Sequence, residues 1–201
     1  MKKPFFIGLP VLLLVFGFLF AGCDSGDGSR DLPISTTQWE MGRDGFYQFS
    51  TNDPQYYNYS FLRFLGHDSD TYEIECKKMS GNPDYAYGLI FGAANNNTDQ
   101  YFLLWITCNG AYRIVKQNGA TATYITDWAR SGTVLTGYNR TNTLKVTKSG
   151  TSYTVFINNN QIDQFTDSSQ FGQRIGFYAS AGKEEDESFP NKPVDVRFRI
   201  K

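Results

Sequence analysis

Residues 141–162 read TNTLKVTKSGTSYTVFINNNQI and hold two apolar-polar alternations, one on each side of Ser149-Gly150. The alternating apolar side chains are Leu144, Val146, Tyr153, Val155 and Ile157. A period of two residues predicts β-strands with one buried face, and Ser-Gly between two such runs predicts a turn. Asn158–Asn160 supplies a further tight turn, because asparagine tolerates left-handed backbone angles. The segment therefore predicts an antiparallel hairpin that ends in another turn.

Similar short runs recur after residue 40, and none of them shows a sustained 3.6-residue apolar period. We predict strands at residues 71–78, 87–93, 101–107, 112–116, 143–148, 152–158, 174–180 and 194–200. Glycine and asparagine at Gly81–Asp84, Asn109-Gly110 and Asn118-Gly119 predict turns between them. About eight or more antiparallel strands joined by hairpins are typical of sandwiches and barrels. Ser35–Leu65 is expected to add the first strands of the same all-β domain.

The composition excludes several classes of protein. The 201 residues carry 19 Lys+Arg and 20 Asp+Glu, a formal net charge of −1. Nucleic-acid-binding proteins normally show a basic excess on one face, so no nucleic-acid partner is predicted. Aromatic residues make up 16% and charged residues 19%, which argues against a disordered chain. His67 is the single histidine, which excludes a zinc site built on several histidines.

The N-terminus is typical of a secretory signal. Two lysines precede an almost wholly apolar run over residues 4–20, and Ala21-Gly22-Cys23 follows. The small pair before a cysteine resembles a bacterial lipobox. That resemblance implies cleavage before Cys23, a diacylglyceryl group on its thiol, and a lipoprotein of the bacterial cell envelope that partners the membrane through its lipid anchor. The alternatives are an uncleaved membrane anchor or an ordinary signal peptide.

These observations divide the chain into three parts. Residues 1–22 are the expected signal peptide, residues 23–37 are the lipidated cysteine and a small, polar, glycine-rich flexible tether, and residues 38–201 are the sandwich domain. The domain holds Cys76 and Cys108. In an oxidising compartment such an even pair forms a disulfide; the alternative is a pair of buried free thiols.

The order of the strands and turns is also familiar. YGLIFG (87–92) is followed by NNTDQYFLLWI (96–106), NGAYRIVKQNG (109–119), ITDWARS (125–131) and RIGFYA (174–179). This order resembles the concanavalin A-like jelly roll, and over Tyr72–Ile200 it is similar to bacterial LamG-like domains grouped with the 3-keto-disaccharide hydrolase domain. The resemblance implies a β-sandwich of two antiparallel sheets. Such sandwiches host lectins, glycosidases, adhesion modules and inert spacers.

The acidic residues give no catalytic pattern. Jelly-roll glucanases that this fold resembles place three acids on one strand face, whereas here Glu73 and Glu75 are followed by lysines. We interpret both as the solvent face of a strand. Asp68 and Asp70 are a candidate for a hard cation, and the charge run Lys183–Ser188 for calcium or a basic partner, but solvated loops are the commoner reading of both. No catalytic residue, metal or cofactor is predicted.

Aromatic residues remain as the candidate ligand-binding set. Sugars bind to proteins by stacking on aromatic faces, with a few polar groups that fix their orientation. We expect Phe102, Leu104 and Ile106 to face the core, and the other face to hold the candidate residues Tyr101, Trp105, Tyr112, Tyr124, Trp128 and Tyr178. The Asn-rich turns at 95–97 and 158–160 are expected to rim that face.

The sequence thus predicts a non-catalytic, lectin-like module whose partner is a carbohydrate or a glycosylated surface. Two alternatives stay open at this point. One is a sugar-active hydrolase without the usual acid triad, and the other is an adhesion or structural envelope module without a small ligand. The oligomeric state is also left open.

Overall fold

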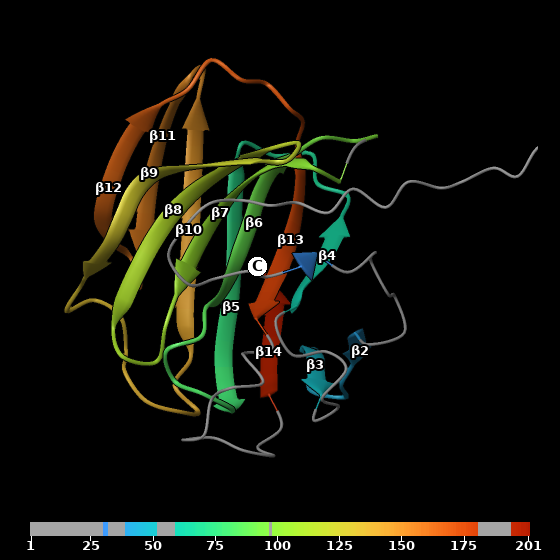
Figure 1. Cartoon of the computed structure of the whole chain (residues 1–201), viewed down its shortest axis with the longest axis vertical. Helices are drawn as coiled ribbons and strands as arrows, with labels where there is room; N and C mark the ends of the chain where they lie inside the picture. The colour runs from blue at the N-terminus through green and yellow to red at the C-terminus, as the bar shows by residue number, and fades with distance from the viewer. Residues whose placement is uncertain (1–29, 32–38, 52–58, 97, 181–193) are drawn as a thin grey trace, which may run out of the picture.

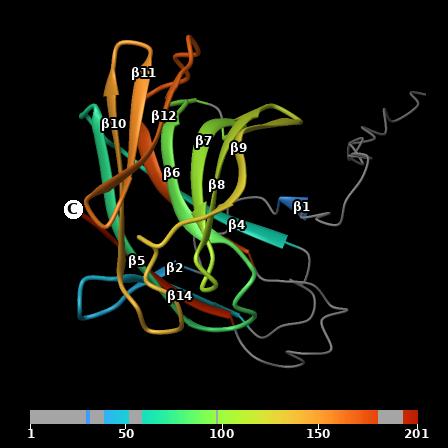
Figure 2. The same ribbon diagram turned by 90° about the vertical axis from the view of Figure 1, so that its left-hand side faces the viewer.

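The computed structural model describes residues 30–31, 39–51, 59–96, 98–180 and 194–201. Within these residues the chain is all-β and forms two seven-stranded sheets. The sheets lie face to face, with β6–β9 in one layer and β5 and β10–β12 in the other (Figures 1 and 2). The predicted fold class, a sandwich of two antiparallel sheets, is confirmed.

Sheet A has the strand order β1-β4-β13-β6-β7-β8-β9. Its neighbouring strands are antiparallel except β1 and β4, which pair in parallel. Its strands are β1 (Arg30–Asp31), β4 (Tyr59–Leu65), β6 (Tyr87–Ala93), β7 (Gln100–Ile106), β8 (Ala111–Asn118), β9 (Thr121–Arg130) and β13 (Arg174–Ser180).

Sheet B has the strand order β12-β11-β10-β5-β14-β3-β2, and its neighbouring strands are antiparallel. Its strands are β2 (Trp39–Met41), β3 (Tyr47–Thr51), β5 (Thr71–Ser80), β10 (Asn142–Ser149), β11 (Ser152–Ile157), β12 (Asn160–Thr166) and β14 (Val194–Ile200). Residues 39–51 therefore extend sheet B, while residues 59–65 extend sheet A, as expected for the first strands of the same sandwich.

The main core lies between the two sheets and follows from the alternation in the sequence. In β5, Tyr72, Ile74 and Cys76 are fully buried, and the residues between them are partly exposed. They meet the inward side chains of sheet A, among which Phe102 and Leu104 are also fully buried. Because each strand sends alternate side chains inward, the two sheets share one continuous apolar layer.

A second apolar cluster covers the outer face of sheet A, the face turned away from sheet B. It contains Leu62, Phe64, Ala86, Ile90, Ala93, Tyr101, Leu103, Val115 and Tyr178, with Trp105 packed against it. As a result, every residue of β6 is buried. The sequence signal for this was the unbroken apolar run in β6 and β7, which is typical of strands covered on both faces.

Several predicted strands match the structure to the residue, namely 87–93, 174–180 and 194–200. One prediction was wrong in a way that matters for function. No strand was predicted between residues 116 and 143, so Tyr124 and Trp128 were expected in a loop, but both belong to β9. This strand lies at the edge of sheet A and most of its residues are exposed, so it lacks the alternation by which a strand is recognised.

The N-terminal predictions lie outside the described residues. These are the signal peptide at 1–22, lipidation at Cys23 and the tether, apart from the two-residue strand at Arg30–Asp31. Within the described residues, no helix has the length and apolar character needed to cross a membrane. The charge run Lys183–Ser188 also falls outside the part of the chain that is described.

Cys76 and Cys108 are free thiols, and both are buried. The structure therefore corresponds to the second of the two alternatives, and the disulfide is not formed. Burial raises the pKa of the Cys108 thiol above its usual value, although Lys78 nearby acts in the opposite direction. Two protonated thiols of this kind pack as small apolar groups.

A pair of asparagines fastens the loop at 131–141 to sheet B. Asn142 is fully buried; its amide accepts a hydrogen bond from Leu135 N–H (2.8 Å) and donates one to Leu135 C=O (3.1 Å). The Asn158 amide donates to the Thr133 carbonyl (2.7 Å) and to Asn142 (2.8 Å). Asn158 and Asn159 have left-handed backbone angles (φ 51° and 65°), as the predicted turn requires.

This arrangement overturns one expectation. The turn at 158–160 joins β11 to β12 in sheet B, so it does not rim the outer face of sheet A. Its first asparagine has a structural task instead, because its side chain bonds the backbone of another loop.

Replacement of Asn142 by alanine is expected to lower the free energy of unfolding by about 3 kcal/mol. The reason is that the amide and carbonyl of Leu135 and the Asn158 amide would lose buried hydrogen-bond partners. Urea unfolding measures the difference. Asn95→Ala, at an exposed position, is the matched control and should change stability by less than about 0.5 kcal/mol. Equal stability of the two variants would contradict the assigned role.

Candidate functional site

The candidate site begins with a row of residues that crosses the outer face of sheet A. Tyr178 of β13 lies opposite Gly88 of β6, Gly88 lies opposite Trp105 of β7, and Trp105 lies opposite Arg113 of β8. Directly paired residues in a sheet project from the same face. Four neighbouring strands, whose order can be followed in Figure 1, therefore bring these residues into one line.

Gly88 allows the two aromatic rings of the row to meet. The ring centroids of Trp105 and Tyr178 are 4.9 Å apart, although β6 runs between their strands. A Cβ atom at Gly88 would overlap the carbonyl oxygen of Leu104 in β7. Glycine is required here because the backbones approach too closely for a side chain.

Strand β9 adds two more rings at the edge of the sheet. Trp128 stacks on Trp105 with ring centroids 6.2 Å apart and an interplanar angle of 25°. The Arg113 guanidinium carbon lies 4.0 Å from the ring centroid of Tyr124 and 4.7 Å from that of Trp128. Both distances are within the range of cation–π attraction. The guanidinium is thus held by aromatic faces.

Asp127 completes the polar part of the site. Its carboxylate pairs with the Arg113 guanidinium and accepts a hydrogen bond from the Trp128 backbone N–H (2.7 Å). The Trp128 hydrogen bond and then the Arg113 hydrogen bond lower the pKa of the Asp127 carboxyl below its usual value. Because its side chain is 79% exposed, the carboxylate stays ionised and open to solvent.

Two N–H donors in the row have no partner among the described residues. They are Nε1 of Trp105 and Nε of Arg113, and both atoms are buried. Their residues face each other across β7 and β8. An unpaired buried donor is unfavourable, so these two groups raise the free energy of the folded state.

The accessible aromatic surface lies on the β9 side of the row. Tyr124 is 54% exposed and Trp128 is 40% exposed. Tyr101 and Tyr178 lie on the same outer face, but they are 3% and 6% exposed and belong to the second apolar cluster. The structure therefore brings Trp105, Tyr124, Trp128 and Tyr178 together, and leaves Tyr101 as a buried packing residue that contacts Phe64 (5.6 Å between centroids).

The placement of Tyr112 on this face was wrong. Tyr112 lies opposite Ile106, is buried between the sheets, and its hydroxyl donates to the Ile162 carbonyl (3.5 Å). A two-residue Asn109-Gly110 turn would have placed Tyr112 opposite Thr107, on the face of Trp105. The observed loop has three residues, 108–110. Thr107 N–H donates to the Ala111 carbonyl (3.0 Å), and Gly110 has a φ of 84°. One extra loop residue shifts the register and reverses the face.

Sequence reasoning also missed Arg113 and Asp127. The same register correction that moves Tyr112 inward places Arg113 beside Trp105. The signal for the arginine was thus present in the strand, but it depended on the length of the loop. Asp127 precedes Trp128 directly, yet β9 has a register shift against β8 that no sequence pattern indicated.

The candidate acids of the alternative hydrolase reading lie elsewhere. Glu73 and Glu75 are on β5 of sheet B. Glu75 pairs with Arg199 and with Lys201 (3.0 Å). Partial burial raises the pKa of the Glu75 carboxyl, but the hydrogen bonds from Lys201 and Arg199 outweigh it and lower the pKa. A general acid needs the opposite shift.

The candidate cation loop forms local hydrogen bonds. His67 Nε2 lies 2.8 Å from the Thr71 carbonyl oxygen, and Thr71 N–H donates to the Ser69 hydroxyl (3.0 Å). Across the described residues, no group of three or more His, Cys, Asp or Glu side chains is placed to hold a metal ion. These contacts describe a solvated turn of side-chain and backbone hydrogen bonds.

Comparison with solved structures agrees with this architecture. A carbohydrate binding module, CBM66 from Bacillus subtilis, superposes with a TM-score of 0.53 and 14% identity, covering 81% of this chain and 88% of that one. The β-glucanase of Bacillus licheniformis superposes with a TM-score of 0.54 and 12% identity, covering 88% and 85%. No family model and no curated protein matches the chain.

The fold is a concanavalin A-like jelly roll. At these identities the likeness concerns the fold alone, since one fold hosts many functions.

Replacement of Gly88 by alanine is expected to lower the free energy of unfolding by about 2 kcal/mol or more, because its Cβ would force β6 and β7 apart. Gly132→Ala is the control, since a Cβ there meets open space. Chemical denaturation of both variants checks the expectation. A Gly88→Ala protein as stable as the Gly132→Ala control would show that the close approach does not constrain the row.

Proposed function

We propose that the chain is a non-catalytic, carbohydrate-binding module of the bacterial cell envelope, held at the membrane by lipid on Cys23. The observation that carries the binding proposal is the group formed by Trp128 and Tyr124 around the Arg113–Asp127 pair. It joins exposed aromatic faces to oriented polar groups on a solvent-accessible edge.

The geometry suits a sugar ring. The apolar C–H face of a sugar stacks on an aromatic ring, and Trp128 offers such a ring, backed by Trp105. Asp127 accepts hydrogen bonds from sugar hydroxyls, while the guanidinium of Arg113 donates them. A few polar groups beside aromatic surface are the usual composition of small-ligand sites. The carbohydrate-binding module among the structural neighbours favours the same class of ligand.

We propose a protein without catalytic activity because its candidate carboxyl groups do not suit glycoside hydrolysis. Most glycoside hydrolases use two carboxyl groups that flank the scissile bond, one of them an acid with a raised pKa. Asp127 is ion-paired and exposed, and its pKa is lowered, so it suits hydrogen bonding to hydroxyls. Glu73 and Glu75 lie on sheet B, and the row described above is on sheet A.

Trp128→Ala is expected to abolish specific binding on a glycan array, because it removes the exposed stacking surface. The loss should be at least about tenfold in affinity. The array uses protein that begins near Ser35. Met41→Ala, which removes an exposed apolar side chain on β2 of sheet B, should bind as the wild type does. Specific binding that survives Trp128→Ala would move the site elsewhere, and a blank array with folded wild-type protein would contradict carbohydrate binding.

The anchoring proposal rests on the lipobox-like Ala21-Gly22-Cys23 after an apolar run. Expressed from its full-length gene in a bacterium that processes lipoproteins, the wild-type chain should label with a metabolic fatty-acid probe and sediment with membranes. Cys23→Ser should lose the label, because the thiol that carries the lipid is gone. Ser25→Ala, two residues away, should behave as the wild type. Equal labelling of the Cys23→Ser chain would contradict lipidation at this position.

A further inference from the structure

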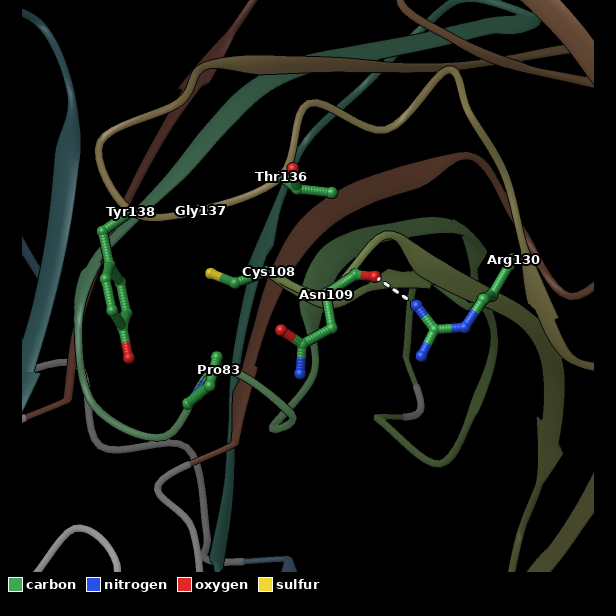
Figure 3. Close-up of a pocket in the computed structure, with 7 residues that line it drawn as sticks. All are labelled: Pro83, Cys108, Asn109, Arg130, Thr136, Gly137 and Tyr138. Carbon is green, nitrogen blue, oxygen red and sulfur yellow. Dashed lines mark hydrogen bonds between the residues drawn. The ribbon is translucent and has the colours of Figure 1, made fainter.

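A pocket of about 510 Å³ lies at one end of the sandwich, beside the aromatic row. Its walls come from the turns at 81–85 and 107–110 and from the loop at 131–139. Figure 3 shows Arg130 and Tyr138 on opposite sides of this pocket, with Asn109 and Pro83 between them. The volume falls within the range of small-ligand sites, about 300–1,000 Å³.

Backbone hydrogen bonds tie the walls of the pocket to one another. Cys108 N–H donates to the Pro83 carbonyl (2.9 Å), and Gly137 N–H donates to the Cys108 carbonyl (2.9 Å). Ser131 N–H donates to the Gly110 carbonyl (2.9 Å). Each of the three wall segments is therefore bonded to at least one of the others. A pocket built in this way is preformed, so little of the binding free energy is spent on ordering its loops.

Lys78 forms hydrogen bonds with two of the segments that line the pocket. It is 1% exposed, and its ammonium donates to the carbonyls of Asn82 and Tyr85 (3.0 Å to Tyr85). Its own carbonyl accepts from Asn139 N–H (2.8 Å) in the opposite wall. Burial lowers the pKa of the Lys78 amine to about 8. One residue thus connects the turn at 81–85 with the loop at 131–139.

Arg130 links the pocket to the aromatic row. Ala129 packs against the core between the sheets, so Trp128 and Arg130 project from the outer face on either side of it. Two strand residues span about 7 Å. The Arg130 guanidinium then donates to the Asn109 carbonyl (2.9 Å) at the pocket wall, as the dashed line in Figure 3 marks. The stacking surface at Trp128 and the pocket are therefore neighbours on one strand.

Tyr138 gives the far wall an oriented aromatic surface. Its hydroxyl donates to the Gly81 carbonyl, while its ring remains 40% exposed. The other polar side chains that line the pocket are those of Arg130, Thr136 and Asn109, and the Asn109 amide nitrogen already donates to the Asp84 carboxylate. One fixed ring beside a guanidinium, a hydroxyl and an amide oxygen is a suitable environment for a polyhydroxylated ring.

We infer that the pocket is a second subsite for the same glycan, so that the protein binds an extended chain which passes from Trp128 over Arg130 to Tyr138. This inference rests on the proposed carbohydrate function. Arg130 donates hydrogen bonds at the junction, Asn109 and Thr136 bind hydroxyls, and the Tyr138 ring stacks on the sugar in the pocket. A single terminal sugar fills only the surface at Trp128.

The test is a length series measured by calorimetry. The probes are linear cello-, laminari-, manno- and xylo-oligosaccharides of two to six residues together with their monosaccharides. The wild type should gain about tenfold in affinity as a chain grows long enough to reach the pocket. Arg130→Ala and Tyr138→Ala should lose this gain and still bind the shortest bound probe as the wild type does. Met41→Ala, at an exposed position on β2, should keep the full gain.

The outcomes separate the two proposals. If the wild type binds, loses binding with Trp128→Ala, and shows the same affinity for all lengths, the second subsite is overturned while the binding face stands. If no probe of any length binds, both are overturned. Tyr138→Phe keeps the ring and loses only the hydroxyl, so it should retain most of the gain; a loss equal to that of Tyr138→Ala would overturn stacking in the pocket.

Discussion

The register between β7 and β8 is the constraint on which the site depends. The hairpin closes with three residues between Thr107 and Ala111, so Trp105 lies opposite Arg113. A register shifted by one residue would exchange the two faces of β8. Arg113 would then be driven between the sheets and Tyr112 would point outward. The same turn carries Cys108 and Asn109 into the wall of the end pocket, so one loop length determines both the aromatic row and its neighbour.

The row then illustrates how a charged group is kept on an apolar face. The Arg113 side chain is 15% exposed, and a guanidinium this far from water needs compensation. Two aromatic faces and the Asp127 carboxylate provide it. Since Asp127 is itself exposed, the pair stays accessible at the open edge of sheet A. The opposite end of the row is closed, because Tyr178 is packed in the second cluster.

The strands of this sandwich were largely predictable, while the site was predictable only in part. Alternation located β5 and β14, because a buried face imposes a period of two, and an unbroken apolar run located β6. The edge strand β9 was not predicted, since no face of it is regularly buried. Trp105 was placed by the alternation of its strand and Trp128 was chosen from residue type, whereas Arg113 needed a register that depends on one loop residue. A contact across strands far apart in sequence, such as Trp105 with Tyr178 over Gly88, follows from sheet order, which local patterns do not encode.

The buried Lys78 amine lowers the free energy of unfolding. Lowering its pKa from 10.5 to about 8 means that the unfolded chain binds the proton more strongly. The charged amine therefore disfavours the folded state by roughly 3 kcal/mol at neutral pH, a cost that disappears as the pH rises from about 8 toward 10.5. An apolar residue would avoid that cost but would leave the carbonyls of Asn82 and Tyr85 without their donor. The lysine thus lowers the overall stability, but it fixes the turn at 81–85, which is one wall of the pocket.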